Sequence, residues 1–495
     1  MQHRPSSPFL IAGLAAVFTL AAEGQQQDQL ALKSRQAKTL LTQGRFADAI
    51  PLYEELVKAL PGNPGLRLNL GTAEHMAGRD REAAATLGAL LRADPNNGPA
   101  LAMCGASYLR LGEPAKATGF LERASRVMPQ DSDVLRMLAD AALTTGKFVT
   151  ASSALRALAK VQPEEPGVWA GLGHSYEALA GEAFAKLDSL AAGSPYWLAL
   201  AAETRLTQRQ FRGALALFLE ALGKVNRRDW RESVAAIYAQ TGHPDLAAAE
   251  KNKAAGHALP PCAKPTAECH FLARRFLAAA ESQGQTAEVL YWRSKAYNEL
   301  AREAFAHLSR FPDSAEWHSF LGNLYRTQGK YEESIKEWQT AIGKRPGDLD
   351  LERELAATVL AGKDFARAEA ALRTLLDKTP NNSELLWMLG EALMAQRKLA
   401  EAIAPLERAV KLAPTLLAAR ASLGRALLGV NRAADAVPHL RAAIPTDRDG
   451  SLHFQLSRAL AAQGKSAEAA AFAQKSQQLR RLTGDDGQAG EITPP

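Results

Sequence analysis

The sequence predicts an all-α solenoid, in which helical pairs stack one after another along the chain. Its clearest sign is a proline that returns every 34 residues, at Pro61, Pro95, Pro129 and Pro163 and again at Pro346, Pro380 and Pro414. Glycines keep the same step at Gly44, Gly78, Gly112 and Gly146. The composition agrees, because 47% of the residues are hydrophobic and only 6% are aromatic, which suits packed helices better than strands. A fixed period of this size marks a repeat array, which presents a long binding surface more often than a catalytic pocket.

Each unit of the period has the pattern of two amphipathic helices joined by a tight turn, since apolar residues recur at helical spacing in both halves. An early pair such as Leu70-Gly71 supplies a small residue where two helices can approach closely. The mid-unit glycine, replaced by Lys363 and Asn431 in two units, fits the left-handed residue that ends the first helix. The proline ends the second helix because it cannot continue one. A single pair cannot bury its own apolar faces, so neighbouring pairs must stack.

This pattern resembles the tetratricopeptide repeat in its period, its small-residue positions and its closing proline. The resemblance covers most of residues 30–482, with about thirteen units, and is weakest over 229–313. It implies a right-handed superhelix whose concave face is lined by the first helix of each pair.

The resemblance also implies which residues face that groove, namely those at or beside the second, fifth, sixth, ninth and twelfth positions of a unit. Such side chains suit an extended peptide or a partner helix, because Met adapts its shape and Arg pairs with carboxylates. The candidates are Asn69, His75, Met103, Arg110, Arg136, Met137, Asp140, His174, Asn323, Arg326, Trp387, Met388, Glu391, Arg425 and Arg458. The expected partner is therefore another protein or peptide.

The pattern divides the chain into segments. These are an export signal over 1–22, a polar linker over 23–29, an N-terminal array over 30–255, a Pro- and Cys-containing interruption over 256–285, a C-terminal array over 286–482 and a disordered tail over 483–495. An atypical unit near 166–195 lacks its turn. Residues 177–190 and 298–311 share seven of fourteen positions, which indicates either an old duplication or the shared packing demands of a variant repeat.

The first residues have the pattern of a secretory signal peptide. Arg4 precedes an uncharged apolar run from Phe9 to Ala22, and the small residues at its end favour cleavage near Ala22. The run is short for a membrane span, and no later segment is apolar enough to be one. We expect a periplasmic or secreted protein, with an uncleaved N-terminal membrane anchor as the alternative.

Three cysteines are present. Cys104 falls at an inward position of a repeat helix, where a buried thiol is expected. Cys262 and Cys269 lie together in the Pro-rich interruption, and in an exported protein a disulfide between them is plausible. With His257 and His270 their spacing fits no standard zinc finger, so no metal and no cofactor are expected.

The charge is mild for this length, because 59 basic residues face 53 acidic ones and the signs are interspersed. One local basic cluster could contact nucleic acid or an anionic lipid, and consists of Lys224, Arg227, Arg228 and Arg231. It lacks the interleaved aromatic residues of single-strand binders, so no nucleic acid is expected as a partner.

The sequence contains no complete catalytic motif, so the chain is not expected to be an enzyme. Gly464-Lys465-Ser466 resembles the end of a phosphate loop, but position 459 holds Ala where the loop needs Gly. The hypothesis is a non-catalytic scaffold or adaptor that binds protein in the cell envelope or outside the cell. The alternative is an accessory factor in envelope or polysaccharide assembly or export that binds glycan or tethers an enzyme.

Overall fold

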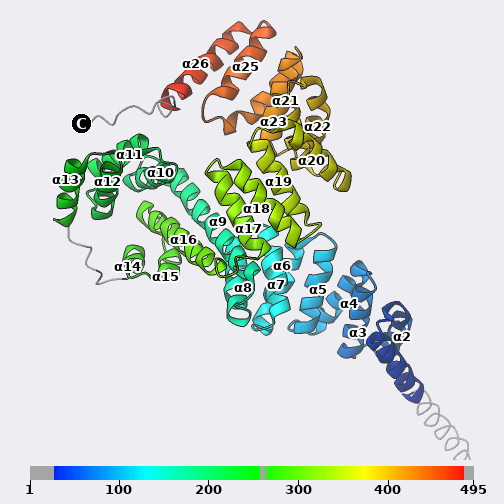
Figure 1. The fold of residues 1–495 in the computed structure, drawn as a ribbon. Helices are drawn as coiled ribbons and strands as arrows, with labels where there is room; N and C mark the ends of the chain where they lie inside the picture. Colours follow the sequence, from blue (N-terminus) through cyan, green and yellow to red (C-terminus); the bar gives the residue numbers. More distant parts are fainter. Residues whose placement is uncertain (1–26, 257–261, 263–264, 484–495) are drawn as a thin grey trace, which may run out of the picture. The chain divides into compact units, whose positions relative to one another are not determined.

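The computed structural model describes residues 27–256, 262 and 265–483, and every element in these ranges is a helix (Figure 1). The expected export signal over 1–22 and nearly all of the expected tail lie outside them. Residues 27–29, which the sequence assigned to the linker, belong to the first helix, which covers 27–42.

The helices follow one another in pairs. The first group comprises the helix over 27–42, α2 (Phe46–Ala59), α3 (Pro64–Met76), α4 (Asp80–Ala93), α5 (Gly98–Arg110), α6 (Pro114–Val127), α7 (Ser132–Thr144), α8 (Phe148–Val161) and α9 (Pro166–Ala191). The second comprises α10 (Pro195–Thr207), α11 (Phe211–Lys224), α12 (Arg228–Gln240), α13 (Pro244–Ala255), α14 (Ala267–Leu272), α15 (Phe276–Ala280) and α16 (Ala287–Leu308). The third comprises α17 (Ala315–Thr327), α18 (Tyr331–Lys344), α19 (Leu349–Ala361), α20 (Phe365–Lys378), α21 (Ser383–Ala395), α22 (Leu399–Leu412), α23 (Leu417–Gly429), α24 (Ala433–Ala443), the 3₁₀ turn η1 (Ile444–Thr446), α25 (Ser451–Ala462) and α26 (Ser466–Thr483).

The chain forms two compact units, and the division falls within α9 and α16. One unit contains the chain up to Ala180 together with Tyr297–Ala304, and the other contains Gly181–Ala296 together with the chain from Phe305. In the first unit Tyr176 of α9 stacks on Tyr297 of α16, with ring centroids 6.1 Å apart.

The atypical repeat near 166–195, which was predicted to lack its turn, is one continuous helix, α9. The assignment of 256–285 as an interruption between an N-terminal and a C-terminal array stays a prediction.

Helix ends follow the pattern that the sequence predicts. The glycine turns at Gly44, Gly78, Gly112 and Gly146 have φ between 68° and 81°, and Lys363 and Asn431 adopt φ of 67° and 63°. Each is the left-handed residue that follows a first helix and turns the chain toward the second, a conformation that glycine adopts without steric strain. Each periodic proline directly follows the C-cap residue of a second helix, as Pro61 follows Leu60.

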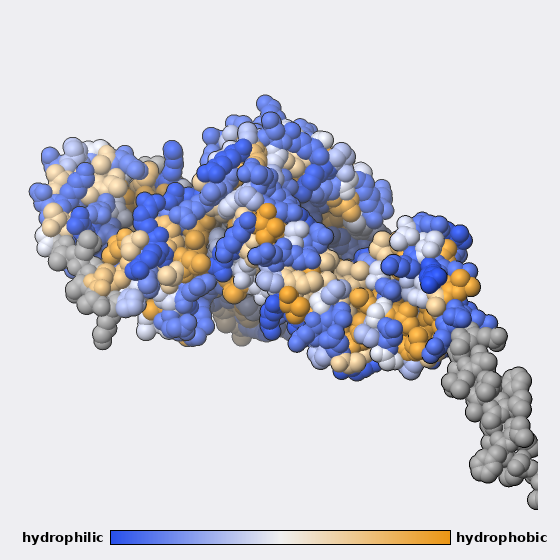
Figure 2. Space-filling view, turned by 90° about the horizontal axis from the view of Figure 1, so that it is seen from below, coloured by the Kyte–Doolittle hydropathy of each residue, from blue (hydrophilic) through white to orange (hydrophobic). Residues whose placement is uncertain are grey.

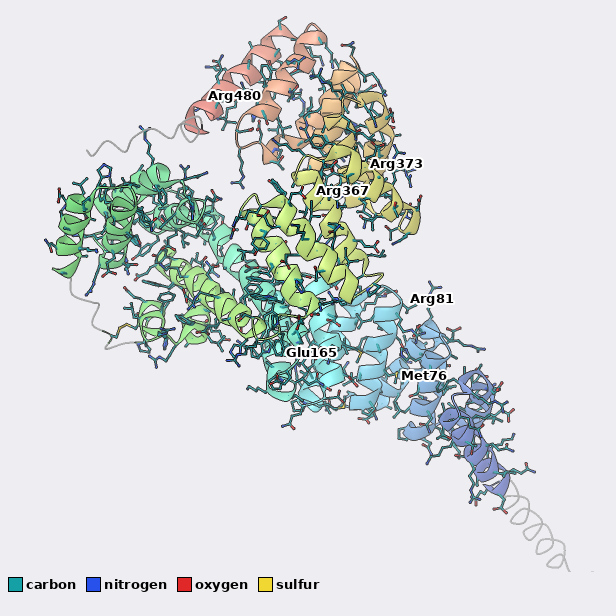
Figure 3. The ribbon with its side chains drawn as sticks, in the orientation of Figure 1. Met76, Arg81, Glu165, Arg367, Arg373 and Arg480 are labelled. Atoms are coloured by element: carbon teal, nitrogen blue, oxygen red, sulfur yellow. A yellow bond between two sulfur atoms is a disulfide. The ribbon has the colours of Figure 1, made fainter. Side chains whose placement is uncertain are left out.

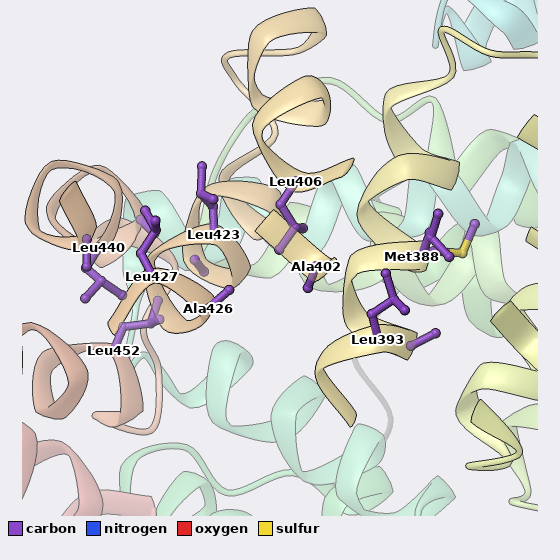
Figure 4. Close-up of a cluster of buried hydrophobic side chains, with 14 of the residues drawn as sticks. Met388, Leu393, Ala402, Leu406, Leu423, Ala426, Leu427, Leu440 and Leu452 are labelled. Atoms are coloured by element: carbon purple, nitrogen blue, oxygen red, sulfur yellow. The ribbon is translucent and has the colours of Figure 1, made fainter. Parts of the chain in front are cut away.

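The two helices of a pair meet through one recurring contact, between a small residue on the first helix and a large one sixteen positions later. A methyl group added to Gly390 would lie 2.5 Å from Leu406, and one added to Gly322 would lie 2.7 Å from the Trp338 ring. The same contact joins Gly71 to Leu87, Gly105 to Leu121 and Gly424 to Leu440. Leu406 and Leu440 belong to the buried cluster that runs through the C-terminal helices (Figure 4).

The surface between these buried contacts is mostly polar. Figure 2 shows hydrophilic residues over most of the visible face and apolar residues in small, separate groups. None of the helices in the described ranges is both long and apolar enough to cross a membrane.

The recurring contact makes a specific prediction about two glycines of one repeat. Gly322→Ala should lower the free energy of unfolding by about 1–3 kcal/mol, because Trp338 is buried and must move to admit the methyl group. Gly343→Ala is the matched control, since α18 leaves open space there and alanine favours a helix by about 0.5–1 kcal/mol. Urea unfolding followed by circular dichroism measures both; equal midpoints for the two variants would contradict the close-approach account.

Candidate functional site

The first helices of successive pairs form continuous rows. In the first unit α3 packs on α5 and α5 on α7, and in the second α19, α21, α23 and α25 pack in the same way. The side chains that these helices leave uncovered therefore share one surface within each row, which we call the inner row surface. Most of the residues predicted to line a groove lie on these helices.

The row α21–α23–α25 carries a pocket of about 340 Å³. It is lined by Trp387, Ala418, Ala421, Ser422, Arg425, Ser451, Leu452 and Gln455. We call it the Trp387 pocket. Its floor of alanines and Leu452 is apolar, and its polar groups come from three successive repeats. Two of the predicted residues, Trp387 and Arg425, line it together.

The polar walls of the Trp387 pocket are held in place by hydrogen bonds between repeats. The Trp387 indole donates to Ser422 Oγ at 3.1 Å. Arg425 donates to the same hydroxyl at 3.1 Å and to Glu391 Oε1 at 2.7 Å. Because Arg425 and Glu391 are 41% and 27% exposed, this ion pair is in contact with water and can exchange partners at little cost.

A second cation lies one turn further along α25. Arg458 is exposed, and the contact seen for its guanidinium is Gln455 Oε1 at 3.5 Å. No carboxylate within the described part of the chain pairs with Arg458. Two cations, Arg425 and Arg458, therefore lie near the pocket together with the carboxylates of Glu391 and Asp449, the second of which accepts from the Ser451 amide at 2.9 Å.

Two predicted cations are already used to tie neighbouring repeats together. Arg326 donates to Glu354 at 2.8 Å and to Asn323 at 2.6 Å. Arg136 donates to Glu165 and, at 2.6 Å, to Gln162. Sequence reasoning missed the acidic partners, although opposite charges about one repeat apart were a usable signal.

His75 and Arg110 belong to a network that joins α3, α4 and α5. His75 Nδ1 lies 2.8 Å from Asp80 Oδ1 and 2.9 Å from Ser107 Oγ, and Arg110 donates to the His75 carbonyl at 2.8 Å. The guanidinium of Arg110 also pairs with Asp80 at 3.1 Å. Ser, His and Asp meet here, but both partners use the same ring nitrogen and Ser107 is fully buried, so this is no nucleophilic triad.

The remaining predicted residues differ in their exposure. Met388 is a correction, because it is buried in the hydrophobic core of the C-terminal helices (Figure 4), and His75 is buried as well. Asn69, Met103 and Met137 are half-buried on α3, α5 and α7, while Asp140 and His174 are exposed. Met388 was predicted to lie at or beside a groove position, and its neighbour Trp387 lines the pocket. The assignment of these residues to a protein-binding groove stays a prediction.

The basic cluster near 224–231 is neutralised by carboxylates. Arg227 pairs with Glu268 and Asp229, Arg228 with Glu232, Arg231 with Glu250, and Lys224 with Glu220, at distances between 2.6 and 3.0 Å. The cluster therefore presents little free positive charge to a phosphate backbone.

The cysteines occupy two environments. Cys262 and Cys269 form a disulfide, with their Cα atoms 5.6 Å apart. Cys104 is a free thiol inside the first unit, and burial raises its pKa to about 11.

Tandem helical pairs of this kind define a repeat solenoid, a class that acts through its surfaces. Tetratricopeptide-repeat models match residues 40–106 and 108–174 and, in a second version, residues 294–348, 354–416 and 422–484. Together these ranges cover more than half of the sequence. The chain belongs to the tetratricopeptide repeat family, whose repeats generally mediate contacts between proteins and are typically not catalytic.

Solved structures of repeat proteins resemble parts of the chain. The crystal structure of MamA protein has 18% identity and a TM-score of 0.30, covering 36% of this chain and 98% of that one. The repeat protein TTC0263 from Thermus thermophilus has 19% identity and a TM-score of 0.30, covering 35% and 98%. MamA from Desulfovibrio magneticus RS-1, residues 41 to the end, has 20% identity and a TM-score of 0.32, covering 34% and 97%. No curated protein matches the sequence.

The His75 network predicts a pH dependence of stability. Burial lowers the pKa of His75, opposed by its hydrogen bond to Asp80 and reinforced by the charge of Arg110. Since the unfolded ring binds a proton near pH 6.5 and the folded ring resists it, stability is full above that pH and falls as the pH drops below it.

We therefore expect the first unit to lose stability between about pH 7.5 and about pH 5.5, and His75→Gln to lose less over that interval. At the higher pH the free energy of unfolding of the variant should be about 1–2 kcal/mol lower than that of the original protein, because two side-chain hydrogen bonds are lost. Urea unfolding at both pH values compares the proteins; burial also lowers the pKa of His439, but that residue is the same in both. Identical pH dependence in the two proteins would refute the assignment.

Proposed function

We propose that the chain is a non-catalytic scaffold that binds another protein through the inner row surface of its C-terminal helices. The observation that carries this proposal is the Trp387 pocket, which combines an apolar floor, an aromatic wall and an exposed arginine across α21, α23 and α25. Such a combination suits an extended peptide or a helix that inserts one apolar side chain, and buried aromatic and arginine residues dominate binding energy at interfaces.

The charges near the pocket indicate the character of the ligand. Arg425 is shared with Glu391, but Arg458 has no acidic partner among the described residues, so a ligand carboxylate can be accepted without first breaking an internal pair. The arginines in other repeats, such as Arg326, would have to leave Glu354 before they could bind. We infer that the C-terminal helices, and not the whole length of the array, bind the partner.

The proposed place of action is the cell envelope or the outside of the cell. Its support is the signal-like sequence before Ala22 and the Cys262–Cys269 disulfide, since disulfides persist mainly in oxidising compartments.

A glycan is the second candidate ligand, and the feature that favours it is the Trp387 ring in the pocket wall. Aromatic faces can stack on sugar rings, so the alternative role in envelope or polysaccharide assembly is testable with the same variants.

The test is a screen of the full chain from residue 23 against a displayed peptide library and a glycan array. We expect peptides with a shared acidic and apolar motif, with a Kd of about 1–100 µM and at least a roughly tenfold loss of affinity in Arg425→Glu. Arg367→Glu is the matched control, because Arg367 is exposed on the second helix α20 (Figure 3).

Each outcome is informative when circular dichroism shows that both variants remain folded. Equal binding by the two variants, or no enrichment of peptides, would overturn the proposal. Binding of glycans alone, with loss in Arg425→Glu, would replace the protein ligand with a sugar.

A further inference from the structure

The short helices α14 and α15 cover an aromatic cluster that a regular repeat would cover with two full helices. α14 has six residues and α15 has five, whereas the helices of regular pairs have thirteen or fourteen. Helices this short have too few hydrogen bonds to be stable alone, so their order depends on what fixes them.

Beneath them lies a network of aromatic rings and charges. Trp230 and Trp292 are almost fully buried, and the Arg227 guanidinium lies over both rings, 5.4 and 5.1 Å from their centroids. Tyr291 is fully buried and its hydroxyl accepts a hydrogen bond from Trp230 Nε1 at 2.9 Å. A further cation, Lys295, donates to Tyr291 at 3.2 Å.

Three side chains of α14 attach it to this network, and one of them, Ala267, lies in the same buried cluster. Glu268 accepts a hydrogen bond from Arg227 Nη2 at 2.6 Å, and both side chains are nearly buried. Phe271 packs against Trp292 with ring centroids 4.9 Å apart. If α14 left, Arg227 would lose one of its two carboxylates and the Trp292 ring would lose its contact with Phe271, so the docked position is favoured.

The disulfide is placed to secure this attachment. Cys269 directly follows Glu268 and is 5% exposed, whereas Cys262 is exposed. Thr266 caps the helix by accepting from the Cys269 amide at 3.2 Å. The bond therefore fixes the first turn of α14, including the residue that pairs with Arg227.

We propose that Cys262 is a site of thiol–disulfide exchange and that the disulfide is a reversible clasp for α14. The co-reactant is a dithiol, which in a cell would be a dithiol oxidoreductase. Its thiolate attacks the exposed sulfur of Cys262, a mixed disulfide forms, and Cys269 leaves as a thiolate that takes up a proton. The second thiolate of the dithiol then closes its own disulfide and releases Cys262, so the dithiol is oxidised by two electrons and the protein is reduced by two.

Reduction then frees α14 from the aromatic cluster while the regular repeats keep their packing. α15 stays in place, because Arg293 of α16 donates to the carbonyls of Ala280, Ser282 and Gly284 at its C-terminal end. The effect is local because α14 joins the cluster through Glu268, Phe271 and Ala267, none of which belongs to the regular pairs. Trp230, Tyr291 and Trp292 then form the surface that becomes accessible. The thiol state of the surroundings therefore regulates access to this surface.

The experiment compares the full chain before and after dithiothreitol, by timed alkylation with iodoacetamide and by hydrogen–deuterium exchange. After reduction we expect Cys269 to react within about tenfold of the rate of Cys262, and amide protection over 267–272 to fall by about tenfold or more. Cys104 is the internal control, because it is fully buried in the first unit and should stay unreactive.

Three variants distinguish a disulfide that acts as a reversible clasp for α14 from one that is merely structural. Cys262→Ser should show the reduced pattern without dithiothreitol, and Glu268→Gln should speed Cys269 alkylation in the reduced chain only. Glu232→Gln, which alters an exposed pair with Arg228, should change nothing.

Three results would overturn the proposal. Cys269 could stay as unreactive as Cys104 after reduction, which means that α14 stays docked without the disulfide. Protection could fall equally over α2–α8, which means that the bond supports the whole fold. Dithiothreitol could fail to reduce the bond in the folded chain, which means that Cys262 is not open to exchange.

Discussion

The structure depends on the close approach of the two helices in each pair, which a small residue on the first helix makes possible. Gly322 faces Trp338 and Gly390 faces Leu406 with no room for a methyl group, and Ala356 and Leu372 keep the same spacing with both side chains fully buried. Because the large side chain fills the space that the small one leaves, the distance between the two helices is the same in each pair. The next pair can then stack on a surface of constant shape, which is what allows the same contact to recur from repeat to repeat.

Most of the fold could be predicted because the restraints on each repeat are local. A left-handed turn residue and a closing proline act on the backbone beside them, so their positions locate helix ends without knowledge of the partner. Some turns have no glycine, as at Arg209, Arg274 and Arg397, whose φ values lie between 56° and 63°. An arginine is sterically strained in this conformation. Arg397 lies 34 residues after Lys363 and 34 before Asn431, so the period locates its turn, whereas Arg209 and Arg274 lie off this step and the sequence does not mark theirs.

The binding surface was less predictable than the fold. The position of a residue within the repeat predicts the helix face on which it lies, but not the residue with which it pairs. Arg136, Arg326 and Arg425 were all predicted to face the groove, and each pairs with a carboxylate of a neighbouring repeat, but Arg425 also lines a pocket. Whether an arginine is available to a ligand depends on whether an acidic residue lies about one repeat away. The repeat period gives the same expectation for every repeat and so does not predict this difference. The same limit explains Met388, since a small rotation of the helix decides which of two neighbours is buried.

Both features that suggest a specific role lie where the repeat departs from its pattern. The 34-residue step from Pro414 falls on Arg448, α24 ends after eleven residues and is followed by the 3₁₀ turn η1, and Gly450 with φ of 78° precedes α25 against the backbone of Ser476, where a methyl group would lie 2.5 Å from the carbonyl oxygen. Ser451 and Gln455, both on α25, line the same pocket as Trp387. The clasp at Cys262 and Cys269 likewise occupies an interrupted repeat. The regular helices α21 and α23 supply five of the eight residues that line the pocket, and α25 supplies the other three, so the pocket combines a regular framework with the altered repeat beside it.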